Sequence, residues 1–180
     1  MTANSAHPSA ENPSDRPVWQ ARLSDEAATR AFGAALAPAL RPGDVVLLCG
    51  DLGAGKTALA RAVIQSLEEA AGADGESAAI SDVPSPSFTL VQTYEAGGLT
   101  IWHADLYRLG DTSEVAELGL DPAPPDAVLL VEWSERAGAL WPAEAVTLRL
   151  DYAQGEGREV RIIGDVKADL TRRLLHSLSP

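Results

Sequence analysis

Residues 45–65 have the sequence VVLLCGDLGAGKTALARAVIQ, and the interpretation of the whole chain starts from this stretch. Residues 45–49 are all apolar and form a short run typical of a parallel strand that is buried on both faces. Residues 50–57 then match G-x-x-x-x-G-K-[ST] without a gap, and an alanine-rich helical pattern follows directly. A strand, a glycine-rich loop and a helix in this order predict a phosphate-binding loop.

The residue types in this loop suit the binding of a nucleotide. Gly53 and Gly55 would let backbone N–H groups turn toward an anion, at the positive end of the following helix. Lys56 would reach the β- and γ-phosphates, and the hydroxyl of Thr57 would ligate Mg²⁺. A glycine-rich turn with an incidental lysine is the alternative, but the strand before the loop and the helix after it favour nucleotide binding.

Composition limits the classes of protein to which the chain can belong. The 180 residues are 46% hydrophobic and 22% charged, which is typical of one globular domain. No apolar run approaches the ~20 residues of a membrane span, and the first residues lack the basic and apolar segments of a secretory signal. Cys49 is the only cysteine, which excludes an internal disulfide and fits a reducing compartment. We therefore expect a cytoplasmic protein without a membrane partner.

A net charge of −12, from 26 acidic against 14 basic side chains, argues against independent binding to nucleic acid. Most of the affinity of such binding comes from basic side chains that neutralise phosphates. The longest basic cluster in this sequence is the pair Arg172-Arg173. Any contact with nucleic acid is therefore expected to be indirect, through a partner.

We expect a disordered tail at residues 1–17, rich in Pro, Ser, Asn and Ala, followed by one domain at 18–180. The short link at 97–98 indicates an antiparallel hairpin, whereas the continuous apolar runs indicate parallel strands. The expected fold class is therefore α/β, a sandwich with a mixed parallel and antiparallel sheet. Its predicted strands lie at 18–23, 45–49, 88–94, 99–106, 128–131, 146–152 and 159–163. Its predicted helices lie at 24–40, 57–70, 112–118 and 167–178, and a polar, acidic loop is expected at 73–84.

Two acidic residues at the ends of predicted strands are candidates to serve the phosphates. A site for Mg²⁺ and a nucleotide needs carboxylates close to the loop threonine, usually at the carboxyl end of a neighbouring strand. Glu132 follows the apolar run at 128–131, and Asp105 closes another predicted strand. Glu132 is the candidate metal ligand, and Asp105 would hold a metal-bound water or orient the attacking water. The alternatives are a strand-terminal surface glutamate and a loop-capping aspartate.

Three neighbouring features have open interpretations. His103, two residues before Asp105 on the same face of the strand, is either a shuttle base or a structural histidine. Trp133, beside Glu132, is either core filler or a stacking surface for a partner or substrate. The hydroxyl-rich segment SPSFT at residues 85–89 stands where a switch that senses the γ-phosphate would be expected.

Five motifs occur in order along the chain: GDLGAGKT, SPSFTLVQTYE, HADLYRL, ELGL and VEW. Together they resemble the TsaE family, formerly YjeE, of bacterial ATPases required for the threonylcarbamoyladenosine modification of tRNA. The resemblance covers about residues 23–163, and the ordered set is more specific than the phosphate-binding loop alone. Two differences are modest: Ala58 stands where many members have a second threonine, and the segment at 73–82 is longer and more acidic than usual.

The resemblance implies a small P-loop NTPase-like fold, Mg²⁺-dependent binding of ATP and a weak intrinsic ATPase activity that depends on partners. The implied partners are TsaD and TsaB, the transferase that attaches threonylcarbamoyl to the adenosine beside the anticodon. The tRNA would then be contacted only through that complex. The implied ATP-binding loop consists of Leu52, Gly53, Ala54, Gly55, Lys56 and Thr57.

The resemblance also implies roles outside the loop. Thr57 and Glu132 match the family's Mg²⁺ contacts, and the segment at 85–89 matches its switch. The aspartate of HADLYRL, here Asp105, is linked to hydrolysis, so that Lys56 and Asp105 are the expected catalytic residues. Glu26, at the start of the first predicted helix, would lie near the nucleotide base.

Two other functions are compatible with a phosphate-binding loop. A small-molecule or nucleoside kinase usually recruits additional Arg or Lys groups to neutralise the developing charge. This chain has no Arg-rich lid segment, only scattered Arg108 and Arg136. A nucleotide-sensing module would bind nucleotide tightly and release no phosphate even in the presence of its partners.

Overall fold

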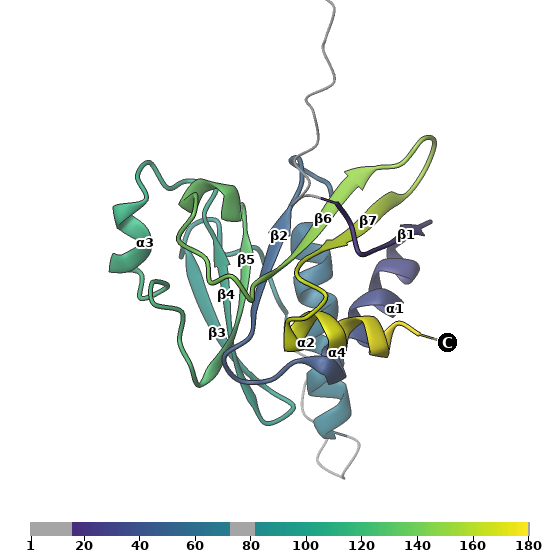
Figure 1. The fold of residues 1–180 in the computed structure, drawn as a ribbon, viewed down its shortest axis with the longest axis horizontal. Coiled ribbons are helices and arrows are strands. Elements are labelled where there is room, and N and C mark those ends of the chain that lie inside the picture. The colour runs from purple at the N-terminus through teal and green to yellow at the C-terminus, as the bar shows by residue number, and fades with distance from the viewer. Residues whose placement is uncertain (1–15, 73–81, 180) are drawn as a thin grey trace, which may run out of the picture.

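A seven-stranded mixed sheet runs through the computed structural model, which describes residues 16–72 and 82–179. The strand order is β1-β7-β6-β2-β5-β4-β3 (Figure 1). The central strands β6, β2, β5 and β4 are parallel to one another, and antiparallel strands complete both edges. The strands are β1 (Trp19–Leu23), β2 (Val45–Cys49), β3 (Val91–Ala96), β4 (Leu99–Asp105), β5 (Ala127–Glu132), β6 (Val146–Tyr152) and β7 (Arg158–Ile163).

Helices cover both faces of this sheet, so the predicted α/β class with a mixed sheet is confirmed. Three of them, α1, α2 and α4, pack on one face, and α3 lies on the other side (Figure 1). None of the helices within the described ranges is long and apolar enough to cross a membrane. The α-helices are α1 (Glu26–Leu36), α2 (Lys56–Gly72), α3 (Ser113–Glu117) and α4 (Asp169–Ser177), and the 3₁₀-helices are η2 (Ala37–Ala39) and η3 (Ser134–Ala137).

The apolar run of β2 is continuous because this strand serves two cores. Val46 and Leu48 pack into the cluster beneath α1, α2 and α4, whereas Val45 and Leu47 pack into the cluster beside α3. All four side chains are buried, and burial of such a side chain contributes about 1.5–3 kcal/mol. Strand β5 divides its side chains between the two clusters in the same way.

The first helix is shorter than the predicted range 24–40. It ends at Leu36, and a single 3₁₀ turn follows. The prediction was wrong at this end because Pro38 has no N–H for the helical ladder and its ring crowds the preceding turn. At the other end, Asp25 is the capping residue, and its carboxylate accepts the N–H of Ala28 at 2.8 Å.

The strand predicted at 88–94 begins later, at Val91. Residues 87–89 form a turn, and Leu90 adopts a left-handed conformation with φ 65°, which a strand cannot include. The hairpin through residues 97–98 is confirmed by the antiparallel pairing of β3 and β4. Residues 1–15 of the predicted tail and 73–81 of the predicted acidic loop lie outside the described residues.

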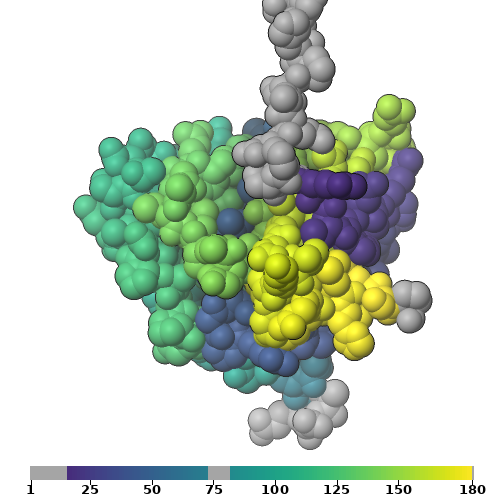
Figure 2. Space-filling model, viewed as in Figure 1, coloured from purple at the N-terminus to yellow at the C-terminus, as the bar shows by residue number. Residues whose placement is uncertain are grey.

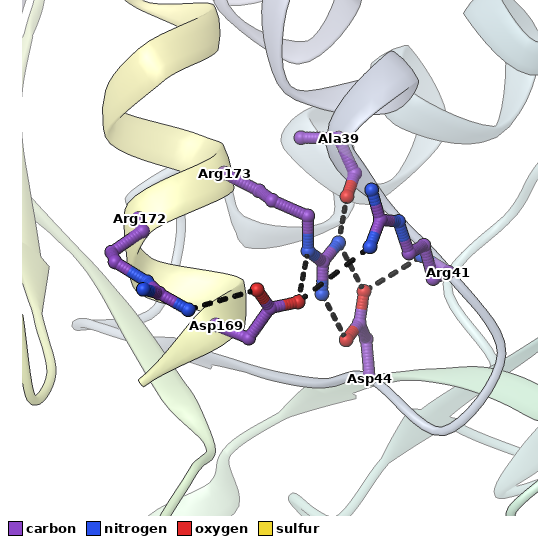
Figure 3. A network of polar contacts seen from close by, with 6 residues as sticks. All are labelled: Ala39, Arg41, Asp44, Asp169, Arg172 and Arg173. Atoms are coloured by element: carbon purple, nitrogen blue, oxygen red, sulfur yellow. Dashed lines mark hydrogen bonds and ion pairs between the residues drawn. The ribbon is translucent and has the colours of Figure 1, made fainter. Parts of the chain in front are cut away.

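The C-terminal helix is attached to the start of β2 by a partly buried ion pair (Figure 3). Arg173 donates two hydrogen bonds to the carboxylate of Asp44, at 2.7 and 3.0 Å, and a third to the carbonyl of Ala39. The hydrogen bonds from Arg173 to Asp44 raise the pKa of the guanidinium above its ordinary value. Arg173 also pairs with Asp169 of its own helix at 2.8 Å. In Figure 2 the C-terminal segment, in yellow, lies beside the N-terminal strand and helix, in purple.

We expect Arg173→Ala to lower the free energy of unfolding by about 1.5–3 kcal/mol, because the charge-assisted hydrogen bonds to the partly buried carboxylate of Asp44 are lost. The matched control is Arg172→Ala, since the pair of Arg172 with Asp169 is largely exposed and contributes little. Urea denaturation of both variants measures the difference. Equal effects of the two substitutions would contradict a role for the pair of Arg173 with Asp44.

Candidate functional site

The register of the parallel strands brings three strand ends to one edge of the sheet. Leu48, near the end of β2, pairs with Glu132 at the end of β5. Glu132 in turn pairs with Asp105 at the end of β4. Helix α2 begins at Lys56, directly after the loop that leaves β2. The loop, both predicted acids and a helix N-terminus therefore meet at this edge, as expected for a parallel sheet.

The loop between β2 and α2 lies against strand β6. Gly50 has φ 136°, and a Cβ atom there would stand 2.1 Å from the carbonyl oxygen of Leu150. Only glycine can occupy this position. Gly53 and Gly55 also have positive φ, at 75° and 108°, which fits the backbone freedom expected of them. Gly50 thus has a structural role that its place in the G-x-x-x-x-G-K-[ST] pattern does not reveal, which is the close approach of the loop to β6.

Two residues of the β6–β7 hairpin hold the outer part of this loop. The hydroxyl of Tyr152 donates to the carbonyl of Leu52 at 2.8 Å. The guanidinium of Arg158 donates to the carbonyls of Gly53 and Ala54, both at 3.1 Å, and stacks on the ring of Tyr152. Sequence reasoning missed both residues, because no local pattern shows that this hairpin lies beside the loop.

Lys56 is buried within the loop that carries it. Its Nζ donates to the carbonyls of Gly50 and Asp51, at 2.6 and 2.9 Å, and lies 3.8 Å from the ring centroid of Trp133. Burial lowers the pKa of Lys56, and the negative charge of Glu132 opposes that shift. Trp133 lies over this charged group and also packs against the apolar cluster beside α3, as core filler would; its use as a stacking surface for a partner or substrate stays a prediction.

Glu132 lies at the centre of a buried polar chain. The hydroxyl of Thr57 stands 2.8 and 2.9 Å from its two carboxylate oxygens. Nε2 of His103 lies 2.9 Å from Oε1 of the same carboxylate. Glu132 and His103 are almost completely buried, so the interpretation of Glu132 as a surface residue is wrong. His103 lies behind Glu132 and does not line the cleft described below.

Asp105 is bound by the hydroxyl-rich segment at 85–89. Its Oδ2 atom accepts hydrogen bonds from the hydroxyls of Ser85 and Ser87, both at 2.7 Å. Its Oδ1 atom accepts the N–H of Tyr107 at 3.0 Å. The segment and the carboxylate therefore form one unit at the end of β4, and Asp105 does cap a turn in this conformation.

Two clefts open on either side of the loop. The first, here called the Trp133 cleft, has a volume of about 400 Å³ and contains most of the predicted site residues. The second, the α1 cleft, has a volume of about 330 Å³ and lies at the N-terminus of α1. The residues that line the Trp133 cleft include Leu52, Lys56, Thr57, Asp105, Glu132 and Trp133. Those that line the α1 cleft include Asp25, Glu26, Thr29, Ala54 and Arg158. Gly53 and Gly55 line both clefts.

The sequence and the fold can be compared directly with known proteins. The family model described as "Threonylcarbamoyl adenosine biosynthesis protein TsaE" matches residues 23–160. The chain belongs to the TsaE family. A TsaE protein from Rickettsia conorii is 39% identical over 145 residues, which are 81% of this chain and 78% of the relative. The TsaE protein of Bacillus subtilis is 35% identical over 133 residues, which are 73% and 77% of the two chains.

A solved structure supports the same conclusion. The crystal structure of YdiB from Bacillus subtilis superposes with a TM-score of 0.65 at 27% sequence identity. The match covers 88% of this chain and 94% of the other. The P-loop NTPase-like fold of the TsaE family is therefore the fold of this chain, and its family role is in the biosynthesis of threonylcarbamoyladenosine in tRNA.

Cys49, at the end of β2 beside this site, is expected to react slowly. Burial raises the pKa of its thiol to about 11, and the hydroxyl of Ser134, 3.1 Å away, opposes the shift only in part. At pH 8 the folded chain should react with iodoacetamide about 100-fold more slowly than the unfolded chain, because only the thiolate is nucleophilic. Mass spectrometry of timed samples measures both rates, with guanidinium chloride for the unfolded chain.

The same pKa shift predicts how stability changes with pH. The fold favours the neutral thiol, so this contribution is complete below pH 9.0 and is lost as the pH rises through about 11. Cys49→Ala should therefore flatten the decline in stability across this range. Equal alkylation rates in the folded and unfolded chains would contradict the environment described for Cys49.

Proposed function

We propose that this chain is a Mg²⁺-dependent ATPase that binds the TsaD–TsaB transferase and supports threonylcarbamoyl modification of the tRNA adenosine beside the anticodon. The observation that carries the proposal is the contact between the hydroxyl of Thr57 and the carboxylate of Glu132 at 2.8 and 2.9 Å. It joins a phosphate-binding loop to an acidic strand end, the combination that a magnesium nucleotide requires.

ATP would bind along the loop, between the two clefts. The phosphates would lie at the N-terminus of α2, where backbone N–H groups and the helix dipole favour an anion. Lys56 would exchange the carbonyls of Gly50 and Asp51 for phosphate oxygens, since a hydrogen bond between two charged groups is stronger than one to a neutral carbonyl. The α1 cleft, with Glu26 at its edge, would receive the adenosine.

The residues present fit Mg²⁺. Thr57 and Glu132 supply oxygen ligands, which a hard cation prefers. In the two described ranges, no group of three or more His, Cys, Asp or Glu side chains is placed to hold a metal ion by itself. Mg²⁺ is commonly held by one or two carboxylates together with substrate phosphates, so it would enter with the nucleotide. Once bound, the ion would neutralise charge that develops on the phosphates.

Asp105 would orient the water that attacks the γ-phosphorus, with release of ADP and phosphate. In the conformation described here, its Oδ2 atom is already occupied by the hydroxyls of Ser85 and Ser87. Turnover therefore requires the segment at 85–89 to release this oxygen, which fits a low activity of the chain alone. Phe88, in the same segment, is 84% exposed, so a partner that contacts its ring would act directly on the segment.

Dependence on partners also follows from charge. With a net charge of −12, the chain is poorly suited to bind tRNA by itself, so the transferase would carry the RNA. A segment that changes contacts between the ATP and ADP states is a common means of coupling hydrolysis to a partner. This work on tRNA would take place in the cytoplasm.

We expect Lys56→Ala to weaken Mg-ATP binding by about 10- to 100-fold, because a charge-assisted contact with the phosphates is lost. In reconstitution with TsaD, TsaB, tRNA and a threonylcarbamoyl donor, the unaltered chain should be needed for repeated rounds of modification, and the variant should fail. Lys167→Ala is the matched control, since Lys167 is exposed and lines neither cleft. Calorimetry that finds unchanged ATP affinity in Lys56→Ala would remove the proposed role of the loop.

The two acids should separate by function. Glu132→Gln should raise the Mg²⁺ concentration required for half-maximal phosphate release. Asp105→Asn should lower kcat and leave the affinity for Mg-ATP nearly intact, because it acts on the water and not on the bound nucleotide. Titration of Mg²⁺ at saturating ATP distinguishes them. Equal losses of binding in both variants would mean that both acids serve the metal.

A further inference from the structure

The hydrogen bond between His103 and Glu132 stands out as a polar contact in an apolar layer. His103 is completely buried on β4, and its Nε2 lies 2.9 Å from Oε1 of Glu132. Ile101 lies on the same face of β4, and Leu130 is the residue of β5 that pairs with His103. Both belong to the core cluster beneath the helices. Nδ1 of His103 has no hydrogen-bond partner among the described residues. An unpaired buried polar atom costs free energy, so this position calls for a reason.

The chemistry of the pair settles which group donates. A carboxylate only accepts hydrogen bonds, so Nε2 of His103 carries the proton and donates to Oε1 of Glu132. Nδ1 of the same ring has no hydrogen-bond partner in the described part of the chain. The bond to Glu132 is therefore the hydrogen bond that the ring nitrogens of His103 make among the described residues.

Glu132 needs this second contact to have one orientation. The hydroxyl of Thr57 lies almost equally far from both carboxylate oxygens, at 2.8 and 2.9 Å, so it does not distinguish them. The bond from His103 reaches Oε1 alone, from the neighbouring strand. Together the two contacts fix the rotation of the carboxylate and leave Oε2 as the oxygen free of the histidine.

We propose that His103 is a positioning residue that orients the carboxylate of Glu132 and thereby sets the affinity of the nucleotide complex for Mg²⁺. The inference rests on the proposed function, because it assumes that Glu132 serves the metal. Groups that hydrogen-bond to metal-binding side chains typically change metal affinity 10- to 100-fold when they are removed. A merely structural histidine would change stability and leave the Mg²⁺ requirement unaltered.

The test compares His103→Leu, which removes the donor, with His103→Gln and His103→Asn. The amide nitrogen of Gln can stand near the position of Nε2, whereas the shorter Asn places its amide near Nδ1, away from Glu132. Thr171→Val is the matched control, because the hydroxyl of Thr171 is also buried without a hydrogen-bond partner among the described residues. Thermal melting identifies the variants that fold.

Two binding measurements follow on each folded variant. Calorimetry gives the affinity for ADP with Mg²⁺ and with excess EDTA, and electron paramagnetic resonance counts the Mn²⁺ bound to the ADP complex. We expect His103→Leu and His103→Asn to require about 10- to 100-fold more metal, with metal-free ADP affinity unchanged. His103→Gln should recover most of the metal affinity, and Thr171→Val should match the unaltered chain.

The possible results separate the two hypotheses. If the unaltered chain binds no ADP, or binds it without any effect of metal, the proposed function fails. If the unaltered chain shows a metal effect and His103→Asn shows the same metal affinity, only the role of His103 fails. Equal weakening of ADP binding with metal and with EDTA would likewise make the histidine structural. If His103→Leu does not fold, the Gln and Asn variants decide the matter.

Discussion

The site depends on the in-register pairing of three parallel strands. Strands β2, β5 and β4 end at the same edge because Leu48 pairs with Glu132 and Glu132 pairs with Asp105. A slip of one residue would send each side chain of these strands to the opposite face, and both faces are packed. The hydrophobic cores on the two faces of the sheet therefore fix the position of the acids relative to the loop, without a contribution from any ligand.

The sequence predicted the elements that repeat a strong local pattern. The two apolar runs, the loop between the first run and its helix, and the acid at the end of the second run all follow from residue order alone. It was less successful where a single residue decides the backbone. Pro38 ends the first helix early, and the left-handed Leu90 delays the strand that was expected from residue 88.

Contacts between distant segments were beyond sequence reasoning. Arg158 and Tyr152 support the loop because β6 lies next to β2 in the sheet, an adjacency that no local pattern encodes. The buried pair of His103 and Glu132 likewise needs the pairing of β4 with β5. His103 was recognised as a candidate, yet only its place behind Glu132 separates a role in orientation from a role in proton transfer.

The three charged side chains of the site have polar partners within the protein. Lys56 has two carbonyls, Asp105 has two hydroxyls and a backbone N–H, and Glu132 has Thr57 and His103. Buried charges are tolerated only with such partners. A nucleotide bound as proposed would therefore replace internal contacts with its own, so the net gain on binding would be smaller than a count of new contacts suggests. On binding, each of these side chains would exchange a partner within the protein for an atom of the ligand.

The anchoring of α4 makes the order of synthesis important for this protein. Asp44 stands just before β2, the strand that leads into the loop. The cation that pairs with it is Arg173 of α4, which comes much later in the sequence. A nascent chain that has not yet exposed α4 to solution holds this carboxylate without its partner. The central strand thus gains this support only after α4 has left the ribosome. A stalled product that stops before Asp169 would lack the cation of Asp44 and the cover that Leu170 and Leu174 give to the core.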